Sequence, residues 1–228
     1  MMIFKNIFFY FLFYFWTTLF FVVFSPVNFF TRRFTVYLSV VWSKSIINLA
    51  KIILGIDYVI EGENNIPKSG PFLVASNHQS AWETFFIYSY FYDSVFILKK
   101  ELKKIPIISR YFKKLGFIFV DRNKGFDSLK HMIESIKSLI CEGNKIFLIF
   151  PQGTRVKPGD KIKLNPGVFA IHKISGIPIL PIRHNSGQFW INKGFLKKRG
   201  LIKVRIFPVL KNGKKKDEVL GNLERIYY

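Results

Sequence analysis

Residues 7–24 form an almost unbroken apolar run, with Lys5 before it and the pair Arg32-Arg33 after it. A helix needs about 20 such residues to cross the hydrocarbon core of a bilayer, so this run is just long enough. A secretory signal peptide would have a shorter apolar region followed by small residues at a cleavage site, whereas bulky residues follow here. The run therefore predicts an uncleaved membrane anchor at the start of the chain.

The next stretch, residues 34–56, mixes apolar residues with Lys44 and Lys51. It predicts an amphipathic helix that lies flat on the membrane, with its lysines toward lipid phosphates. Positive charge close to an anchor marks the cytosolic side. Together with Arg32 and Arg33, these lysines predict a protein of the inner (cytoplasmic) membrane whose remaining residues, and any catalytic domain among them, face the cytosol. A re-entrant hairpin that leaves both of its ends in the cytosol fits the same pattern.

From residue 57 onward, short apolar runs alternate with segments of helical periodicity. Strands are predicted at residues 72–76, 94–98, 117–120, 146–150, 177–182 and 202–207. Helices are predicted at residues 80–92, 107–114, 128–142 and 168–175. Strands that alternate with helices predict a layered α/β domain with a mostly parallel sheet flanked by helices. We thus expect a membrane anchor and amphipathic helix at 1–56 and one α/β domain at 57–228.

The formal net charge is +21, from 35 Lys and Arg residues against 14 Asp and Glu residues. Such a balance suits nucleic acid, an anionic membrane surface or an anionic substrate as the partner. The sequence has no motif for DNA or RNA recognition, which together with the anchor argues against nucleic acid. The single cysteine, Cys141, excludes an intramolecular disulfide, and we expect it in the core because its helix face is otherwise apolar.

His78 and Glu83 lie where the first predicted strand of the α/β domain passes into a helix. Five residues of a continuous helix rotate about 140° beyond a full turn, so the two side chains can meet only if His78 lies in the turn before the helix. The carboxylate would then hold one imidazole nitrogen and leave the other for a substrate hydroxyl, as a general base requires. The alternative is structural, since Ser80 and Glu83 have the spacing of a helix capping box.

Three other strand ends carry groups that suit an anionic ligand. Gly153, Thr154 and Arg155 follow one strand and offer close backbone approach, a hydroxyl and a bidentate guanidinium. Lys99 and Arg122 follow two others. Active sites of open α/β sheets collect at the carboxyl ends of parallel strands. Each group alone also has an ordinary explanation, as a solvated lysine face, a salt bridge at a strand end or a simple turn.

Four segments, in this order, resemble the motif blocks of the glycerolipid acyltransferases. They are His78-x4-Glu83, Gly116-Phe-Ile-Phe-Val-Asp-Arg122, Phe150-Pro-Gln-Gly-Thr-Arg155 and Ile177-Pro-Ile-Leu-Pro181. The chain from about residue 60 to about residue 210 is similar to the 1-acyl-sn-glycerol-3-phosphate acyltransferases of the PlsC type. Four blocks in the right order are far more specific than any one of them.

The resemblance implies a role for each of these residues. His78 would deprotonate the free hydroxyl of lysophosphatidic acid, which then attacks the thioester of the acyl donor, and Glu83 would orient and stabilise the imidazole. The acceptor's phosphate would be held by Lys99, Arg122, Gly153, Thr154 and Arg155. The acyl-donor site would include Ile177, Pro178 and Pro181. The resemblance further implies phosphatidic acid as the product, acyl-CoA or acyl-carrier protein as the co-substrate, and neither a metal nor a cofactor.

Two positions depart from the family pattern. Glu83 stands where Asp is usual, a difference of one methylene, and Gln152 stands where Glu is usual, which removes a charge.

Two other functions remain open. One is acyl transfer to another lysophospholipid or to a lyso-ornithine lipid. The other is a catalytically silent protein that binds a membrane or nucleic acid and whose charge is its function.

Overall fold

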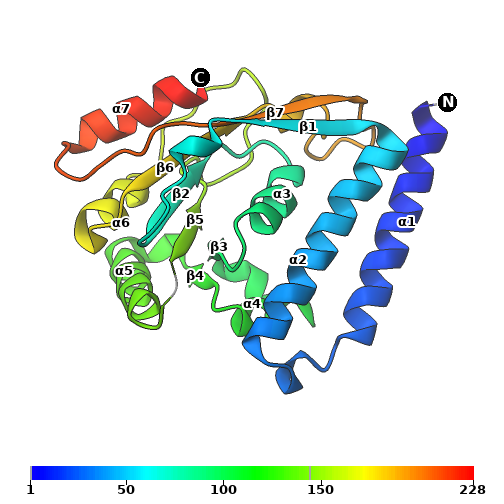
Figure 1. Ribbon diagram of the computed structural model, residues 1–228, viewed down its shortest axis with the longest axis horizontal. Coiled ribbons are helices and arrows are strands. Elements are labelled where there is room, and N and C mark those ends of the chain that lie inside the picture. Colours follow the sequence, from blue (N-terminus) through cyan, green and yellow to red (C-terminus); the bar gives the residue numbers. More distant parts are fainter. Residues whose placement is uncertain (1, 144) are drawn as a thin grey trace.

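A computed structural model describes residues 2–143 and 145–228 (Figure 1). Its centre is a seven-stranded sheet in the order β1-β7-β6-β2-β5-β3-β4. Neighbouring strands run parallel, except that β6 and β7 are antiparallel. Helices pack on both faces of this sheet. The prediction of a layered α/β domain with a mostly parallel sheet is therefore confirmed.

The strands are short, and those in the centre of the sheet are largely apolar. Their bounds are β1 Ile56–Glu61, β2 Phe72–Ser76, β3 Val95–Lys99, β4 Ile118–Val120, β5 Ile146–Ile149, β6 Ile179–His184 and β7 Gly200–Ile206. Every residue of β2 is buried, because helices cover both of its faces. The six predicted strands are all present with slightly shifted ends. β1 was not predicted, since Ile56 continues the helical pattern that precedes it.

Within the described residues, five α-helices belong to the α/β domain. Their bounds are α3 Trp82–Tyr90, α4 Ile108–Lys114, α5 Gly125–Cys141, α6 Gly167–Ser175 and α7 Lys216–Tyr227. α3 packs on one face of the sheet, while α5, α6 and α7 pack on the other. The four predicted helices are confirmed, but α7 was not predicted. It buries Val219, Leu223 and Tyr227, and this four-residue spacing was its signal in the sequence.

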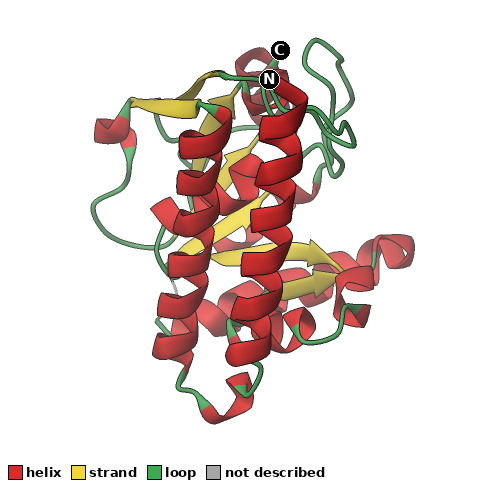
Figure 2. Ribbon diagram, turned by 90° about the vertical axis from the view of Figure 1, so that its right-hand side faces the viewer, coloured by secondary structure: helices red, strands yellow, loops and turns green. Residues whose placement is uncertain are grey.

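The two N-terminal segments form a helical hairpin. It consists of α1 (Met2–Val23), the short connection η1 (Val27–Phe29), and α2 (Arg32–Leu49) extended by the π-helical turn η2 (Ala50–Leu54). The two long helices lie side by side (Figure 2). Gly55, with φ of +69°, ends the hairpin and turns the chain into β1. Both helices are long and apolar enough to cross a membrane.

The hairpin packs against the α/β domain near both ends of α1. Near its start, the side chain of Asn6 exchanges two hydrogen bonds with the backbone of Lys197, with N···O distances of 2.7 and 3.1 Å. Just past its end, the Tyr111 hydroxyl donates to the Phe24 carbonyl oxygen at 2.6 Å. α2 packs against α3. The hairpin is thus part of the folded domain's surface.

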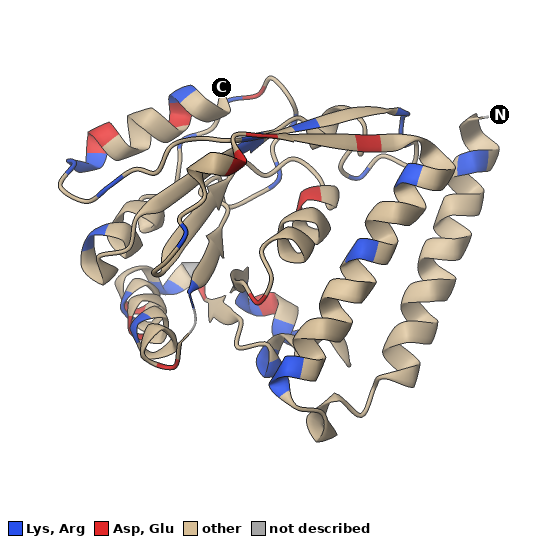
Figure 3. Cartoon of the chain, in the orientation of Figure 1, with Lys and Arg blue, Asp and Glu red and all other residues tan. Residues whose placement is uncertain are grey.

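The outer side of the hairpin is apolar and exposed. Its exposed apolar side chains are Met2, Ile3, Phe4, Ile7, Phe8, Phe11, Tyr14, Phe15, Leu19, Val22, Val23, Phe29, Phe34, Tyr37, Val41 and Ile52. Basic residues are found near the first turn of α1 and along α2, while the rest of α1 carries none (Figure 3). Soluble proteins rarely leave so large an apolar patch in water, so this side is a candidate surface for membrane contact.

Cys141 is exposed, so the expectation that it lies in the core was wrong. It is the last residue of α5, whose buried side is formed by Met132, Ile133 and Ile136. A side chain five residues beyond Ile136 points about 140° away from it around the helix. Cys141 therefore lies outside the buried stripe of α5.

Candidate active site

His78 lies in the loop that joins the carboxyl end of β2 to α3. The loop after β5 holds its backbone, because the His78 N–H donates to Gln152 Oε1 at 2.6 Å and the Val156 N–H donates to the His78 carbonyl oxygen at 2.8 Å. The imidazole stacks on the ring of Phe150, with ring centroids 4.0 Å apart. Both the main chain and the ring of His78 are therefore held by residues of the loop that follows β5.

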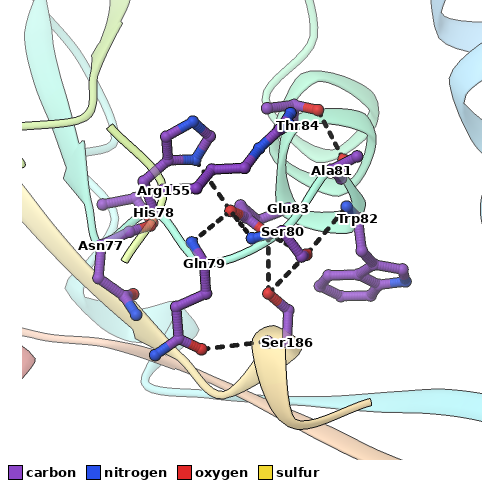
Figure 4. A network of polar contacts seen from close by, with 12 residues as sticks. Asn77, His78, Gln79, Ser80, Ala81, Trp82, Glu83, Thr84, Arg155 and Ser186 are labelled. Atoms are coloured by element: carbon purple, nitrogen blue, oxygen red, sulfur yellow. Dashed lines mark hydrogen bonds and ion pairs between the residues drawn. The ribbon is translucent and has the colours of Figure 1, made fainter. Parts of the chain in front are cut away.

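Glu83, in the first turn of α3, binds the imidazole (Figure 4). His78 Nδ1 and Glu83 Oε1 are 2.9 Å apart. The same oxygen accepts from the backbone N–H groups of Gln79 and Ser80, each at 2.7 Å. Oε2 accepts from the hydroxyl of Ser186 at 2.7 Å and from the hydroxyl of Ser80. Hydrogen-bond donors thus surround a carboxylate that has no exposed surface.

The capping and catalytic interpretations of Glu83 are compatible in this geometry. Glu83 Oε1 reaches back to the Ser80 N–H three residues before it, the spacing that a capping box has between its glutamate and its N-cap. α3 begins at Trp82, and its N-cap residue, Ala81, has no side-chain acceptor of its own. One carboxylate oxygen therefore closes the start of α3 and binds the imidazole of His78 at the same time.

The charge on Glu83 determines which nitrogen of His78 carries the proton. Burial alone would raise the pKa of Glu83, but hydrogen bonds from His78 and from the hydroxyl of Ser80 hold this pKa well below its usual range. The carboxylate is therefore ionised, and Nδ1 of a neutral His78 donates to it. In that tautomer Nε2 carries the lone pair, and no described residue hydrogen-bonds to it. Since the His78 side chain is 15% exposed, this nitrogen belongs to a ring that a ligand can reach.

A second polar pair joins the ends of β2 and β6. The side chain of Asn77 and the backbone of His184 exchange two hydrogen bonds of 2.9 Å. His184 Nε2 donates to the Asn77 carbonyl oxygen at 2.8 Å, and its Nδ1 accepts from the Ser186 N–H at 3.3 Å. Burial lowers the pKa of His184, which keeps this ring neutral. The pair sets Ser186 against Glu83.

Sequence reasoning missed this second pair. Asn77 and His184 are polar residues at the carboxyl ends of two apolar runs, and Ser186 follows shortly after. Like Lys99 and Arg155, these residues lie at the carboxyl ends of strands, where the active sites of open α/β sheets collect. What the sequence lacked was the information that β2 and β6 are neighbours in the sheet.

Gln152 is buried and links His78 to the C-terminal part of the chain. Its Oε1 accepts from the His78 N–H, and its Nε2 donates to the Tyr228 hydroxyl at 3.0 Å. That hydroxyl donates to the Ile162 carbonyl oxygen at 2.9 Å and accepts from the Ile162 N–H at 3.1 Å. An amide accepts at one end and donates at the other, whereas a carboxylate only accepts. The glutamine that departs from the family pattern therefore suits both of its partners.

His78 lines a cavity of about 800 Å³ that is bounded by the hairpin, α3, α4 and several strands. Much of its wall is apolar and includes Phe21, Trp42, Phe85, Phe96, Leu98, Leu102, Ile105, Ile108, Phe112, Leu115 and Phe117. Phe21 and Trp42 belong to the hairpin. A polar reaction centre at the wall of an apolar cavity suits a ligand with a long apolar group.

Four of the five predicted phosphate ligands line the same cavity, namely Lys99, Gly153, Thr154 and Arg155. Gly153 has φ of +70°, which lets the chain turn sharply after β5. Arg155 is exposed, and its Nη1 donates to Asn192 Oδ1 at 3.5 Å. Arg155 is drawn with the His78 network in Figure 4. The structure thus brings cationic and hydroxyl groups to the cavity that His78 lines.

The other predicted site residues are placed differently. Arg122 begins the short helix η5 (Arg122–Lys124) after β4, and its side chain lies outside what the structure describes. Ile177 and Pro178 precede β6, and Pro181 lies within it. Ile177 and Pro181 are buried, and none of these three is among the described residues that line the cavity. Their assignment to the acyl-donor site stays a prediction.

Within residues 2–143 and 145–228, no group of three or more His, Cys, Asp or Glu side chains is arranged to hold a metal ion. That the reaction needs neither metal nor cofactor stays a prediction.

The chain is similar to several known proteins. The family model described as Acyltransferase matches residues 57–185. A 1-acyl-sn-glycerol-3-phosphate acyltransferase of Pseudomonas aeruginosa is 35% identical over 195 residues, which cover 86% of this chain and 74% of the relative. One from Borreliella burgdorferi is 30% identical over 76% of this chain and 69% of its own. The crystal structure of the enzyme PlsC from Thermotoga maritima superposes with a TM-score of 0.80 at 25% identity, covering 99% and 94% of the two chains.

The contacts of Gln152 predict the effect of restoring the usual glutamate. In Gln152→Glu, the carboxylate still accepts from the His78 N–H, but it adds negative charge next to the loop that carries the imidazole. A negative charge there favours the protonated form of the general base, so we expect the inflection of kcat/KM against pH to move upward while the rate on its high-pH plateau stays within about tenfold. Gln152→Leu, which keeps the volume without the charge, is the control. An inflection that does not move in Gln152→Glu would contradict the electrostatic link.

Proposed function

The chain belongs to the acyltransferase family, and we propose that it transfers an acyl group from a thioester directly to the free hydroxyl of 1-acyl-sn-glycerol-3-phosphate. The product is phosphatidic acid, the central intermediate of phospholipid biosynthesis. The enzyme class follows from the family, and the names of the relatives support the acceptor. The acyl donor is acyl-CoA or acyl-carrier protein, since both present the same thioester.

One observation carries the mechanism, namely the free Nε2 of an imidazole whose Nδ1 is bound by an ionised, buried carboxylate. Nε2 of His78 takes the proton of the acceptor hydroxyl as its oxygen attacks the thioester carbonyl. The tetrahedral intermediate collapses, the C–S bond breaks, and the proton on Nε2 passes to the leaving thiolate. Glu83 stabilises the transient imidazolium and keeps the ring in one tautomer. One ester forms for each thioester consumed, with no acyl group on the enzyme.

The polar end of the cavity supports an acceptor with a phosphate. Arg155 offers a planar fork that matches phosphate oxygens, and Lys99 offers a point charge. Thr154 adds a hydroxyl beside them. The apolar remainder of the cavity supports an acyl chain as the other part of the bound substrates.

The hairpin supports a protein attached to the inner (cytoplasmic) membrane by its apolar outer side. Because α1 contacts the α/β domain near both of its ends, a hairpin embedded in one leaflet fits the geometry better than a helix that crosses the bilayer. This agrees with the re-entrant alternative drawn from the sequence. The basic residues around α2, including Arg33 and Lys44, support a cytosolic position of the catalytic domain.

The acceptor is tested by complementation of a host that lacks its own enzyme for this step. We expect the wild-type gene to restore growth and phosphatidic acid, measured by lipid mass spectrometry, and the His78→Ala gene to restore neither. Restored acylation of a lyso-ornithine lipid or another lysophospholipid, without phosphatidic acid, would reject the proposed acceptor.

Substitutions of the His78–Glu83 pair test the general base. We expect His78→Ala to lower kcat by about 10²–10⁴-fold while the fold survives. Glu83→Gln should also lower kcat strongly, because a neutral amide cannot stabilise the imidazolium. Glu83→Asp, the usual residue of the family, should keep substantial activity. Turnover close to wild type in Glu83→Gln, measured with purified protein, would show that Glu83 acts as a helix cap and does not assist His78.

Arg155 is tested by its effect on the two substrates. Arg155→Ala should raise the KM of the acceptor more than the KM of the acyl donor, because the fork binds the phosphate and not the thioester. Arg155→Lys should recover little, since a point charge cannot make the bidentate contact. Steady-state kinetics with acceptors that carry or lack the phosphate distinguish a loss of phosphate binding from a general loss of activity. Equal losses for both acceptors would remove Arg155 from the phosphate site.

A further inference from the structure

A second cavity, of about 490 Å³, lies where the hairpin meets the amino-terminal end of β1. It is lined by Met2, Lys5, Asn6, Lys51, Ile52, Leu54, Gly55, Asp57, Lys197 and Arg199. None of these residues lines the cavity of His78. They come from α1, η2, the start of β1 and the segment before β7. The proposed reaction uses none of them.

The charge of this second cavity is strongly positive. Four basic residues face one carboxylate, that of Asp57, which is paired with Lys51 Nζ at 2.9 Å. Lys197 is nearly buried, and its Nζ donates to the carbonyl oxygens of Ile191 and Gly194 at 3.0 and 2.7 Å. Its ammonium group is therefore already committed to the protein. The charge available to a ligand comes from the other basic residues.

Lys5 and Arg199 supply that charge. Both are exposed, and among the described residues neither forms an ion pair with a carboxylate. Their backbones are held in place. Asn6, next to Lys5, exchanges hydrogen bonds with the backbone of Lys197, and the Gly200 N–H donates to the Gly55 carbonyl oxygen at 3.1 Å. The two cations are thus presented on fixed segments that meet at one cavity.

Gly55 shapes the cavity and positions the arginine. It has φ of +69°, and a Cβ at this residue would lie 2.9 Å from Cγ of Arg199. The stem of Arg199 therefore rests against the bare backbone of Gly55, which leaves no room for a side chain there. Arg199 thus packs part of its stem on Gly55 while the residue as a whole is exposed.

Exposed apolar residues continue directly from this cavity. Its own rim includes Met2 and Ile52, which are 48% and 81% exposed, and Ile3 and Phe4 follow along α1 at 56% and 75%. A free phosphate ion would gain nothing from these neighbours. A molecule with an anionic head and long apolar tails would use both the cations and the apolar face.

We propose that this second cavity binds the phosphate headgroup of an anionic membrane phospholipid, held by Lys5 and Arg199, with its acyl chains along the outer side of α1. The inference rests on the membrane attachment argued under the proposed function. It adds a lipid site separate from the acceptor site at Arg155. Bound lipid would fix the start of the hairpin at the membrane surface.

The test compares two double variants of the full chain in vesicle co-sedimentation. Lys5→Ala with Arg199→Ala removes the site, while Lys137→Ala with Lys214→Ala removes the same charge from exposed positions on α5 and in the turn before α7. Vesicles are phosphatidylcholine alone or phosphatidylcholine with phosphatidylglycerol. We expect the site variant to lose about tenfold of the phosphatidylglycerol-dependent binding and the control variant to lose less than about twofold. Binding to pure phosphatidylcholine should stay unchanged in both.

Arg199→Lys separates a built headgroup site from diffuse attraction, because it keeps the charge but not the fork. A loss of phosphatidylglycerol-dependent binding in Arg199→Lys supports the site. Equal losses in the two double variants, or none in the site variant, would overturn it.

Thermal unfolding checks that each variant is folded. Turnover on detergent-dispersed acceptor is measured separately, so that failure of the lipid site is not confused with failure of the proposed reaction. We expect it to remain near wild type in the site variant.

Discussion

The ionised carboxylate of Glu83, without any exposed surface, is the interaction on which the rest of the active site depends. A buried charge is costly unless donors surround it. Its donors come from the loop after β2 and from Ser186 after β6, so they meet only because these two strands are neighbours. The order of the strands therefore supplies the donors that offset the cost of burying the carboxylate charge. That charge in turn fixes the tautomer of His78.

The hairpin forms part of the wall of the active-site cavity. Phe21 of α1 and Trp42 of α2 form part of the wall of the cavity that His78 lines, while the outer side of the same helices is exposed and apolar. An embedded hairpin would place the cavity next to the lipid from which acyl chains come. A boundary between an anchor and a catalytic domain at residue 56 stays a prediction, although α2 packs against both α3 and α4.

The sequence predicted most of the elements because their signals are local. The apolar runs of β2 and β5 and the periodicity of α5 each depend on residues close together in the chain. The His78–Glu83 contact was predictable for the same reason, since the residues are five apart across a strand-to-helix turn. Cys141 was misjudged because it lies about 140° around α5 from Ile136, outside the buried stripe. β1 was missed because its first residue continues a helical pattern that only Gly55 interrupts.

By itself the sequence determined the two apolar N-terminal segments and the α/β class. It also determined the ordered motif blocks that resemble those of an acyltransferase. Each of these depends on a pattern of residues that are close together in the chain. Only the tertiary structure decided which strands are adjacent, that β7 runs against β6, and that the hairpin folds back onto the domain. It also decided the contacts of Gln152 with His78 and Tyr228, 74 and 76 residues away, and of Ser186 with Glu83, 103 residues away. The physical reason is that such contacts join segments whose meeting depends on the assembly of the whole sheet, which no local pattern encodes.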